Sequence, residues 1–261
     1  MDLETCRLDV ADGIATVTLA RPPVNAQNRR LREETVRVFD QLSDRDDVRA
    51  VILTGAGNVF SAGADIKERR TLVEGPGDYI RHNRLTREFF YAVADCAKPV
   101  ICACNGPAIG AGFALMLHCD IMICSDDTWV TMPEIDLGLA GGGKMMMDHF
   151  GRSWSRYIYF AGSKIPAAEL HRLGVVTACL PRGELMGEAT RIAEAIAAKN
   201  PRAVKQVKRG FQVAEGLPSR DAYRYEQTIT HDLADTAETR EAQTAFVEKR
   251  KADHSGPTRV A

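Results

Sequence analysis

Residues 98–144 constrain the fold most strongly, because apolar runs and glycine-rich loops alternate there. The apolar run 100–104 predicts a buried strand, and the small-residue loop 110–112 then opens an apolar helix. A second apolar run, 119–124, predicts another strand before the glycine run 141–143. A loop of this kind presents unpaired backbone N–H groups at the positive end of a helix dipole. There they can hold an oxygen that becomes negatively charged during a reaction.

A single carboxylate, Glu134, lies between these apolar runs and the glycine run. If it is held close to the loop, it can act as a base on a molecule bound there. The residues alone leave a second interpretation open, in which the glycines only form turns and Glu134 only caps or solvates a loop.

The rest of the sequence alternates strands with helices and then becomes helical. Period-two alternation predicts a β-hairpin over 4–21, and a helix with one apolar face begins at Asn28. Asp235 and Glu238 have the spacing of a capping box. The other expected elements are a strand at 48–54 and helices at 83–97, 166–173, 185–198, from 201 onward, 219–234 and 235–251. This order predicts an α/β core followed by a helical C-terminal extension.

Composition narrows the classes of function. Of the 261 residues, 45% are hydrophobic, and the formal charge of −1 leaves no basic stripe for nucleic acid. The arginine-rich helix start 28–32 is followed at once by Glu33 and Glu34, which favours a solvated face. The seven cysteines lie mainly in apolar runs, which predicts reduced core thiols and a cytoplasmic location. No run reaches membrane-spanning length and the first residues are not typical of a signal peptide, so we expect no membrane association.

Several motifs occur together in a characteristic order. Two small-residue loops, 61–65 and 110–112, each follow a strand and enter a helix. The accompanying motifs are Arg21-Pro22, Asn105-Gly106, Cys119-Asp120, Pro133-Glu134-Ile135 and the closing Phe246-x-x-Lys249-Arg250-Lys251. Over essentially the whole chain this set resembles the enoyl-CoA hydratase/isomerase family, the crotonases.

The resemblance implies a ClpP/crotonase-like α/β fold, a spiral of ββα units over 1–195 with a helical trimerisation region over 196–261. It implies a homotrimer or a dimer of trimers. The implied substrate is an acyl-CoA thioester, with coenzyme A as part of the substrate, no separate cofactor and no metal.

Site residues carry over by position from the family. The N–H groups of Ala64 and Ala111 would bind the thioester carbonyl, although position 111 is usually glycine. The coenzyme A contacts implied by the resemblance are Arg21, Val24, Ala62, Gly63, Ala64, Asp65, Ile66 and Ala111, with Phe246 and Lys249 reaching a neighbouring subunit. For Phe246 and Lys249, a packed aromatic ring and a solvated lysine remain equally good interpretations.

One departure from the family pattern bears on the reaction. Family hydratases hold a water between two glutamates; Glu134 matches the second, but Ala114 stands where the first is expected. The resemblance therefore favours double-bond isomerisation with Glu134 as the single base. Hydration, thioester hydrolysis and acyl-CoA binding without useful catalysis stay open as alternatives. We interpret His118 as a core histidine, and Lys144 and His149 as candidates for tuning substrate choice.

Overall fold

The computed structural model describes residues 2–72 and 74–254. A six-stranded sheet with the order β1-β2-β3-β4-β6-β9 forms the centre of this part of the chain. The hairpin β1–β2 is antiparallel, and the neighbours from β2 to β9 are parallel. A smaller sheet has the order β5-β7-β8. The strands are β1 (Cys6–Ala11), β2 (Ile14–Leu19), β3 (Ala50–Gly55), β4 (Val100–Cys104), β5 (Ala108–Ile109), β6 (Ile121–Ser125), β7 (Trp129–Thr131), β8 (Ile165–Pro166) and β9 (Ala178–Leu180).

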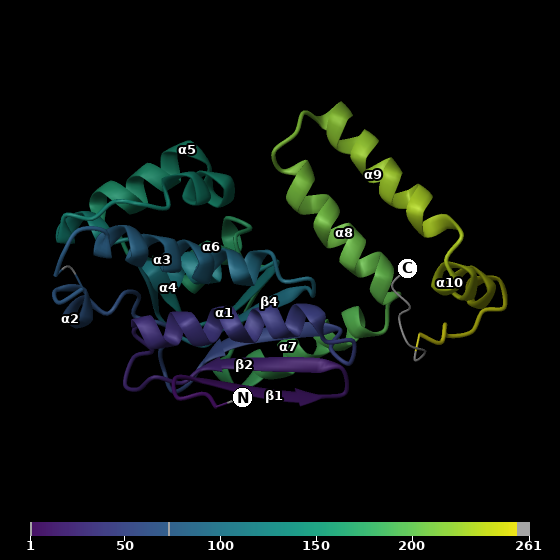
Figure 1. Cartoon of the computed structure of the whole chain (residues 1–261), viewed down its shortest axis with the longest axis horizontal. Helices are drawn as coiled ribbons and strands as arrows, with labels where there is room; N and C mark the ends of the chain where they lie inside the picture. The colour runs from purple at the N-terminus through teal and green to yellow at the C-terminus, as the bar shows by residue number, and fades with distance from the viewer. Residues whose placement is uncertain (1, 73, 255–261) are drawn as a thin grey trace.

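Helices cover both faces of the large sheet and continue beyond it (Figure 1). The helices are α1 (Arg29–Asp44), α2 (Ile66–Arg69), α3 (Asp78–Ala94), α4 (Ala111–Met116), the 3-10 helix η1 (Glu134–Leu137), α5 (Gly143–Ala161), α6 (Ala167–Arg172), α7 (Arg182–Ala197), α8 (Pro201–Ala214), α9 (Ser219–Ala234) and α10 (Ala237–Val247). Among the described residues, no helix is both long enough and apolar enough to cross a bilayer.

The chain repeats a long strand, a short strand and a helix. β4 leads to β5 and α4, and β6 leads to β7, η1 and α5. The loop after β3 takes the place of a short strand in the preceding turn, since Ser61 forms a parallel bridge with Ala108. Successive turns therefore stack their loops side by side, and the candidate site lies at these loops.

Alternate residues of the central strands enter two separate apolar cores. On β3, Val51 and Leu53 face the core formed with α1, α3, α4 and α5. Ala50 and Ile52 face the other core, which α7 closes with Leu185, Ala189 and Ala193. Every residue of β3 is buried, as expected for a parallel strand covered on both faces.

The last three helices lie outside this layered core. α8 and α9 rise from it as a packed antiparallel pair, and α10 follows α9 at the end of the pair opposite the α8–α9 turn (Figure 1). One ion pair fixes α8 to the sheet: Nζ of Lys208 lies 2.7 Å from Oδ2 of Asp120, which also accepts the N–H of Val100 at 2.7 Å. The boundary expected near residue 195 falls close to the end of α7, but the division into two parts stays a prediction.

The structure corrects the solvated-face interpretation of the first helix start. Arg32 is 2% exposed and Glu34 is fully buried. Glu34 accepts hydrogen bonds from the N–H groups of Glu4, Thr5 and Cys6, so it fixes the start of β1 on α1. The Glu34 carboxylate can be buried because tertiary partners satisfy it, and local sequence does not show those partners.

Two helix starts also differ from expectation. α3 begins at Asp78 instead of residue 83, because the Asp78 carboxylate accepts the N–H groups of Glu74 and Gly75 and stabilises the preceding turn. The expected capping box at Asp235 is wrong. Thr236 is the N-cap of α10 and accepts the N–H of Thr239 at 3.2 Å, whereas Asp235 still ends α9.

Candidate active site

Two small-residue loops lie in direct contact at the centre of the site. The N–H of Ile109 donates to the carbonyl of Ser61 at 3.0 Å. A Cβ on Gly63 would overlap the carbonyl oxygen of Ile109, and one on Gly112 would overlap the carbonyl oxygen of Ser61. Glycine at these positions lets the loops approach closely enough for their backbones to act together.

The backbone N–H groups of Ala64 and Ala111 are both unused. Ala64 forms a parallel β-bridge with Gln27, but the two hydrogen bonds of this bridge use the neighbours of Ala64. The N–H of Gln27 donates to the carbonyl of Gly63, and the N–H of Asp65 donates to the carbonyl of Gln27. Ala111 is the first residue of α4, where an N–H has no acceptor within the helix. Across the described residues, neither N–H has a protein acceptor. Both residues line one large cavity, so the two donors are available to a bound oxygen.

Glu134 brings a carboxylate to the same cavity from the start of η1. Its Oε2 atom is buried and has no hydrogen-bond partner among the described residues. Burial raises the pKa of this carboxyl group above its ordinary value. A half-buried carboxylate with one unpartnered oxygen and a raised pKa is suited to taking up a proton and giving it back.

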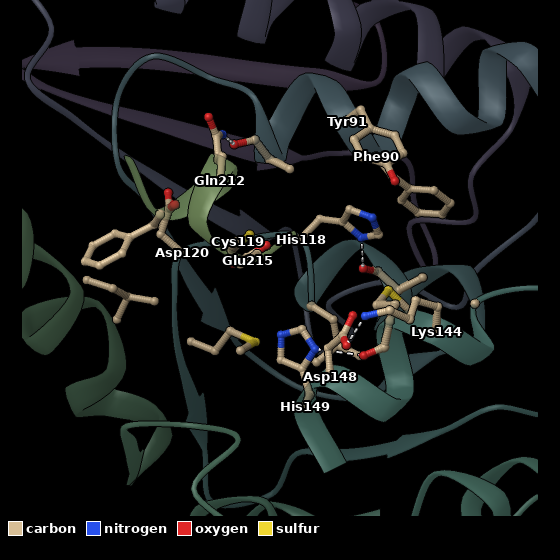
Figure 2. A pocket seen from close by; sticks show the side chains of 18 of the residues that line it. Phe90, Tyr91, His118, Cys119, Asp120, Lys144, Asp148, His149, Gln212 and Glu215 are labelled. Carbon is tan, nitrogen blue, oxygen red and sulfur yellow. Dashed lines mark hydrogen bonds and ion pairs between the residues drawn. The ribbon is translucent and has the colours of Figure 1, made fainter. Parts of the chain in front are cut away.

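The cavity has a volume of about 2170 Å³ and extends between the layered core and α8. Figure 2 shows part of its wall, with His118, Phe90 and Tyr91 near one another and His149 beside Asp148 and Lys144. Ala114 also lines the cavity and is 6% exposed. A methyl group there can neither bind a water through a hydrogen bond nor move a proton.

His118 is oriented by the backbone and by two aromatic rings. Its Nδ1 lies 2.7 Å from the carbonyl oxygen of Ala114, and its ring stacks on Phe90 at 5.0 Å. A carbonyl only accepts, so Nδ1 carries the hydrogen and Nε2 of the neutral ring keeps a lone pair. Burial lowers the pKa of His118, which favours that neutral form. His118 thus packs as a core histidine does, yet it also lines the cavity.

The structure also gathers most of the expected coenzyme A contacts. Arg21 forms an ion pair with Asp65 at 2.6 Å, and the N–H of Ala62 donates to the carbonyl of Val24 at 2.9 Å. Ile66 is 39% exposed at the start of α2. These residues therefore form one cluster beside Ala64.

Phe246 and Lys249 lie elsewhere. Phe246 is 86% exposed on α10, and Lys249 follows that helix with a positive φ of 56°. Neither lines the cavity of its own chain. Their expected contact with the coenzyme A of a neighbouring subunit stays a prediction.

Arg32 is one charged cavity residue that sequence analysis missed. The helical spacing of Arg32 with Thr35, Phe39 and Leu42, which are all buried, offers a signal that could have found it.

Comparisons with known proteins agree with this geometry. The family model described as enoyl-CoA hydratase/isomerase matches residues 9–257. The chain belongs to the enoyl-CoA hydratase/isomerase family. The enoyl-CoA hydratase of Bacillus anthracis superposes with a TM-score of 0.91 at 30% identity, covering 97% of this chain and 100% of that one. The crotonase fold expected from the sequence is therefore confirmed.

Curated members of the family carry more than one activity in their names. A (7aS)-7a-methyl-1,5-dioxo-2,3,5,6,7,7a-hexahydro-1H-indene-carboxyl-CoA hydrolase of Rhodococcus jostii is 34% identical over 92% of this chain and 93% of its own. The short-chain-enoyl-CoA hydratase of Clostridium acetobutylicum is 33% identical over 96% of this chain and 97% of its own. The crotonase described here is accordingly an acyl-CoA enzyme.

Proposed function

We propose that this crotonase isomerises the double bond of an enoyl-CoA, with Glu134 as its single base. The observation that carries the proposal is the combination of two unused N–H groups with one carboxylate that has a buried, unpartnered oxygen in the same cavity. Ala114 supplies no second acid or base, and a 1,3-shift needs only one.

The reaction follows from these groups. The N–H groups of Ala64 and Ala111 bind the thioester oxygen of a 3-enoyl-CoA, and Glu134 removes a proton from C2. The electron pair spreads into a dienolate whose oxygen the two donors stabilise; losing one such donor costs on the order of 3 kcal/mol of barrier. Glu134 then returns the proton to C4, which leaves the 2-enoyl thioester at unchanged mass.

Hydrolysis is the second candidate, and the named Rhodococcus jostii hydrolase favours it. Hydrolysis or hydration requires a second group that positions water. The Nε2 lone pair of His118 is the available acceptor on the helix turn that carries Ala114. In this scheme His118 binds the water and Glu134 accepts a proton.

The third part of the proposal is self-association as a trimer or a dimer of trimers. The supporting observation is a set of exposed apolar side chains on α8–α10: Val207, Phe211, Tyr223, Phe246 and Val247. Side chains of this kind are often covered in an assembly. Light scattering coupled to size exclusion measures the mass directly, and a monomeric mass at micromolar concentration would refute this part.

Matched 2-enoyl- and 3-enoyl-CoA substrates test the reaction. The wild type should convert the 3-enoyl to the 2-enoyl isomer without a mass change, and Glu134→Gln should lose the activity. A gain of one water that disappears in His118→Ala would replace isomerisation by hydration. Free coenzyme A as product would instead indicate hydrolysis, and binding without turnover of any of the thioesters would indicate a binding protein.

A further inference from the structure

The most unusual charge in the cavity wall belongs to Arg32. Its side chain comes from the first turn of α1 and is 2% exposed, yet it is part of the cavity lining that includes Ala64, Ala114 and Glu134. Isolated burial of a charge is costly, so a buried guanidinium normally has a carboxylate partner. In residues 2–72 and 74–254, no carboxylate lies within ion-pair distance of Arg32.

The protein satisfies only one side of this guanidinium. Nη1 donates to Oγ1 of Thr86 at 2.9 Å and lies 3.4 Å from both ring nitrogens of His82. Nε is buried and has no partner among the described residues. The fork of a guanidinium can bind a carboxylate through two parallel N–H groups. Here Nη1 is engaged by Thr86, and the edge formed by Nε and Nη2 has no acceptor among the described residues.

The charges around Arg32 leave the region positive. Arg69 lines the same cavity and donates to the hydroxyl of Tyr79 at 2.6 Å. Burial and the two nearby arginines lower the pKa of His82 to about 4, so this ring is neutral at pH 7. Glu68 is the nearby carboxylate, and its Oε2 is engaged by the N–H of Arg29 at 2.9 Å. The cavity thus contains two arginines that an anion could bind. One of them, Arg32, is buried and forms no ion pair with a carboxylate of the described residues.

We propose that Arg32 binds a carboxylate at the far end of the acyl group, so that the substrates are monothioesters of dicarboxylic acids. This inference rests on the proposed function, in which Ala64, Ala111 and Glu134 hold the thioester. Arg32 lines the same cavity as these three residues, so an acyl group held by them can extend toward its guanidinium within one space. A phosphate of coenzyme A offers the same anionic chemistry, and the experiment must separate the two sources.

Binding of saturated thioesters, which have no double bond to isomerise, separates these possibilities. Succinyl- to suberyl-CoA are each compared with the monocarboxylic acyl-CoA of equal carbon number, by calorimetry on the full chain. The wild type should bind at least one dicarboxylic thioester about tenfold more tightly than its neutral match. Arg32→Met should remove that preference and leave the affinity for neutral thioesters unchanged.

Arg37→Met is the matched control, because Arg37 lies exposed on the same helix. Should Arg32→Met fail to fold, Arg32→Lys keeps the charge without the fork and should retain only part of the preference. A wild type without preference at any chain length overturns the proposal. An equal loss for all thioesters in Arg32→Met would assign Arg32 to a coenzyme A phosphate and also overturn it. Failure to bind any thioester would instead refute the proposed function itself.

Discussion

The carboxylate of Glu134 occupies the space that a side chain on Gly110 would need. A Cβ at Gly110 would overlap Oε1 of Glu134, and the backbone there has φ 53° and ψ −118°. Gly110 directly precedes Ala111, whose N–H faces the cavity as one of the two free donors. The close approach of Gly110 to the Glu134 carboxylate therefore couples the position of this base to the position of the Ala111 N–H.

Gly110→Ala should impair catalysis far more than folding. The backbone at Gly110, with its positive φ, costs alanine about 1–3 kcal/mol, and the new methyl group must displace Glu134. We expect kcat to fall by about 100-fold or more, comparable to the loss of a general base. Gly57→Ala is the control, since Gly57 also has a positive φ but no atom within contact of a Cβ. Equal activities of Gly110→Ala and Gly57→Ala would refute the claim that Gly110 makes room for the Glu134 carboxylate.

Glu134→Gln should lose activity and gain stability at neutral pH. Burial raises the pKa of Glu134 in the folded protein, so ionisation there costs stability as the pH rises above the ordinary carboxyl pKa. Glutamine carries no charge and escapes this cost. Urea unfolding should show the variant more stable than the wild type at pH 7, with the difference disappearing in acid. A variant less stable at pH 7 would contradict this account.

Glu34 should dominate the acid sensitivity of the fold. Burial alone would raise its pKa, but hydrogen bonds from Thr5, Glu4 and Arg30 outweigh it and lower the pKa to about 2. Its contribution is therefore complete above the ordinary carboxyl pKa and lost as the pH falls toward 2. The wild type should lose about 2 kcal/mol of unfolding free energy over this range. Glu34→Gln should be less stable at pH 7 and show a flatter acid dependence; an unchanged slope would refute the assignment.

The ion pair between Lys208 and Asp120 should anchor α8 to the sheet. Asp120→Asn leaves a Lys208 side chain that is 6% exposed without its counter-ion, whereas Lys208→Met leaves Asp120 bonded to the N–H of Val100. We expect a loss of about 2 kcal/mol for Lys208→Met and a larger loss for Asp120→Asn, measured by chemical denaturation. Arg191→Met removes an exposed pair with Glu188 and should change little. A larger stability loss for Lys208→Met than for Asp120→Asn would contradict the prediction.

The sequence predicts those parts of the site that depend on backbone requirements. Glycines at 63 and 112 have no tolerable substitute where two loops touch, so their pattern reveals the loops. Glu134 follows an apolar strand and precedes a glycine run, so the local sequence pattern also predicts it as a site residue. The alternation of strands and helices likewise predicts the α/β core, because the apolar runs are local.

Features that depend on distant partners escape such prediction. Arg32 and Glu34 appear solvated in a run of mixed charge, yet both are buried. The partners of Glu34 lie about 30 positions earlier at Thr5, and those of Arg32 lie at His82 and Thr86. Nothing in residues 28–34 indicates those partners. The helical spacing of Arg32 with Phe39 and Leu42 signals a buried face, but it does not say what the guanidinium contacts there.

The two groups proposed to hold the thioester oxygen are main-chain atoms, and this has an evolutionary consequence. Mutation of a codon can change the side chain at 64 or 111, but it cannot delete the N–H unless it introduces proline. The side chains at 114, 118 and 134 can be exchanged while the donors persist. One lineage can therefore abandon water addition and take up another reaction on the same thioester without first inventing a new way to activate it.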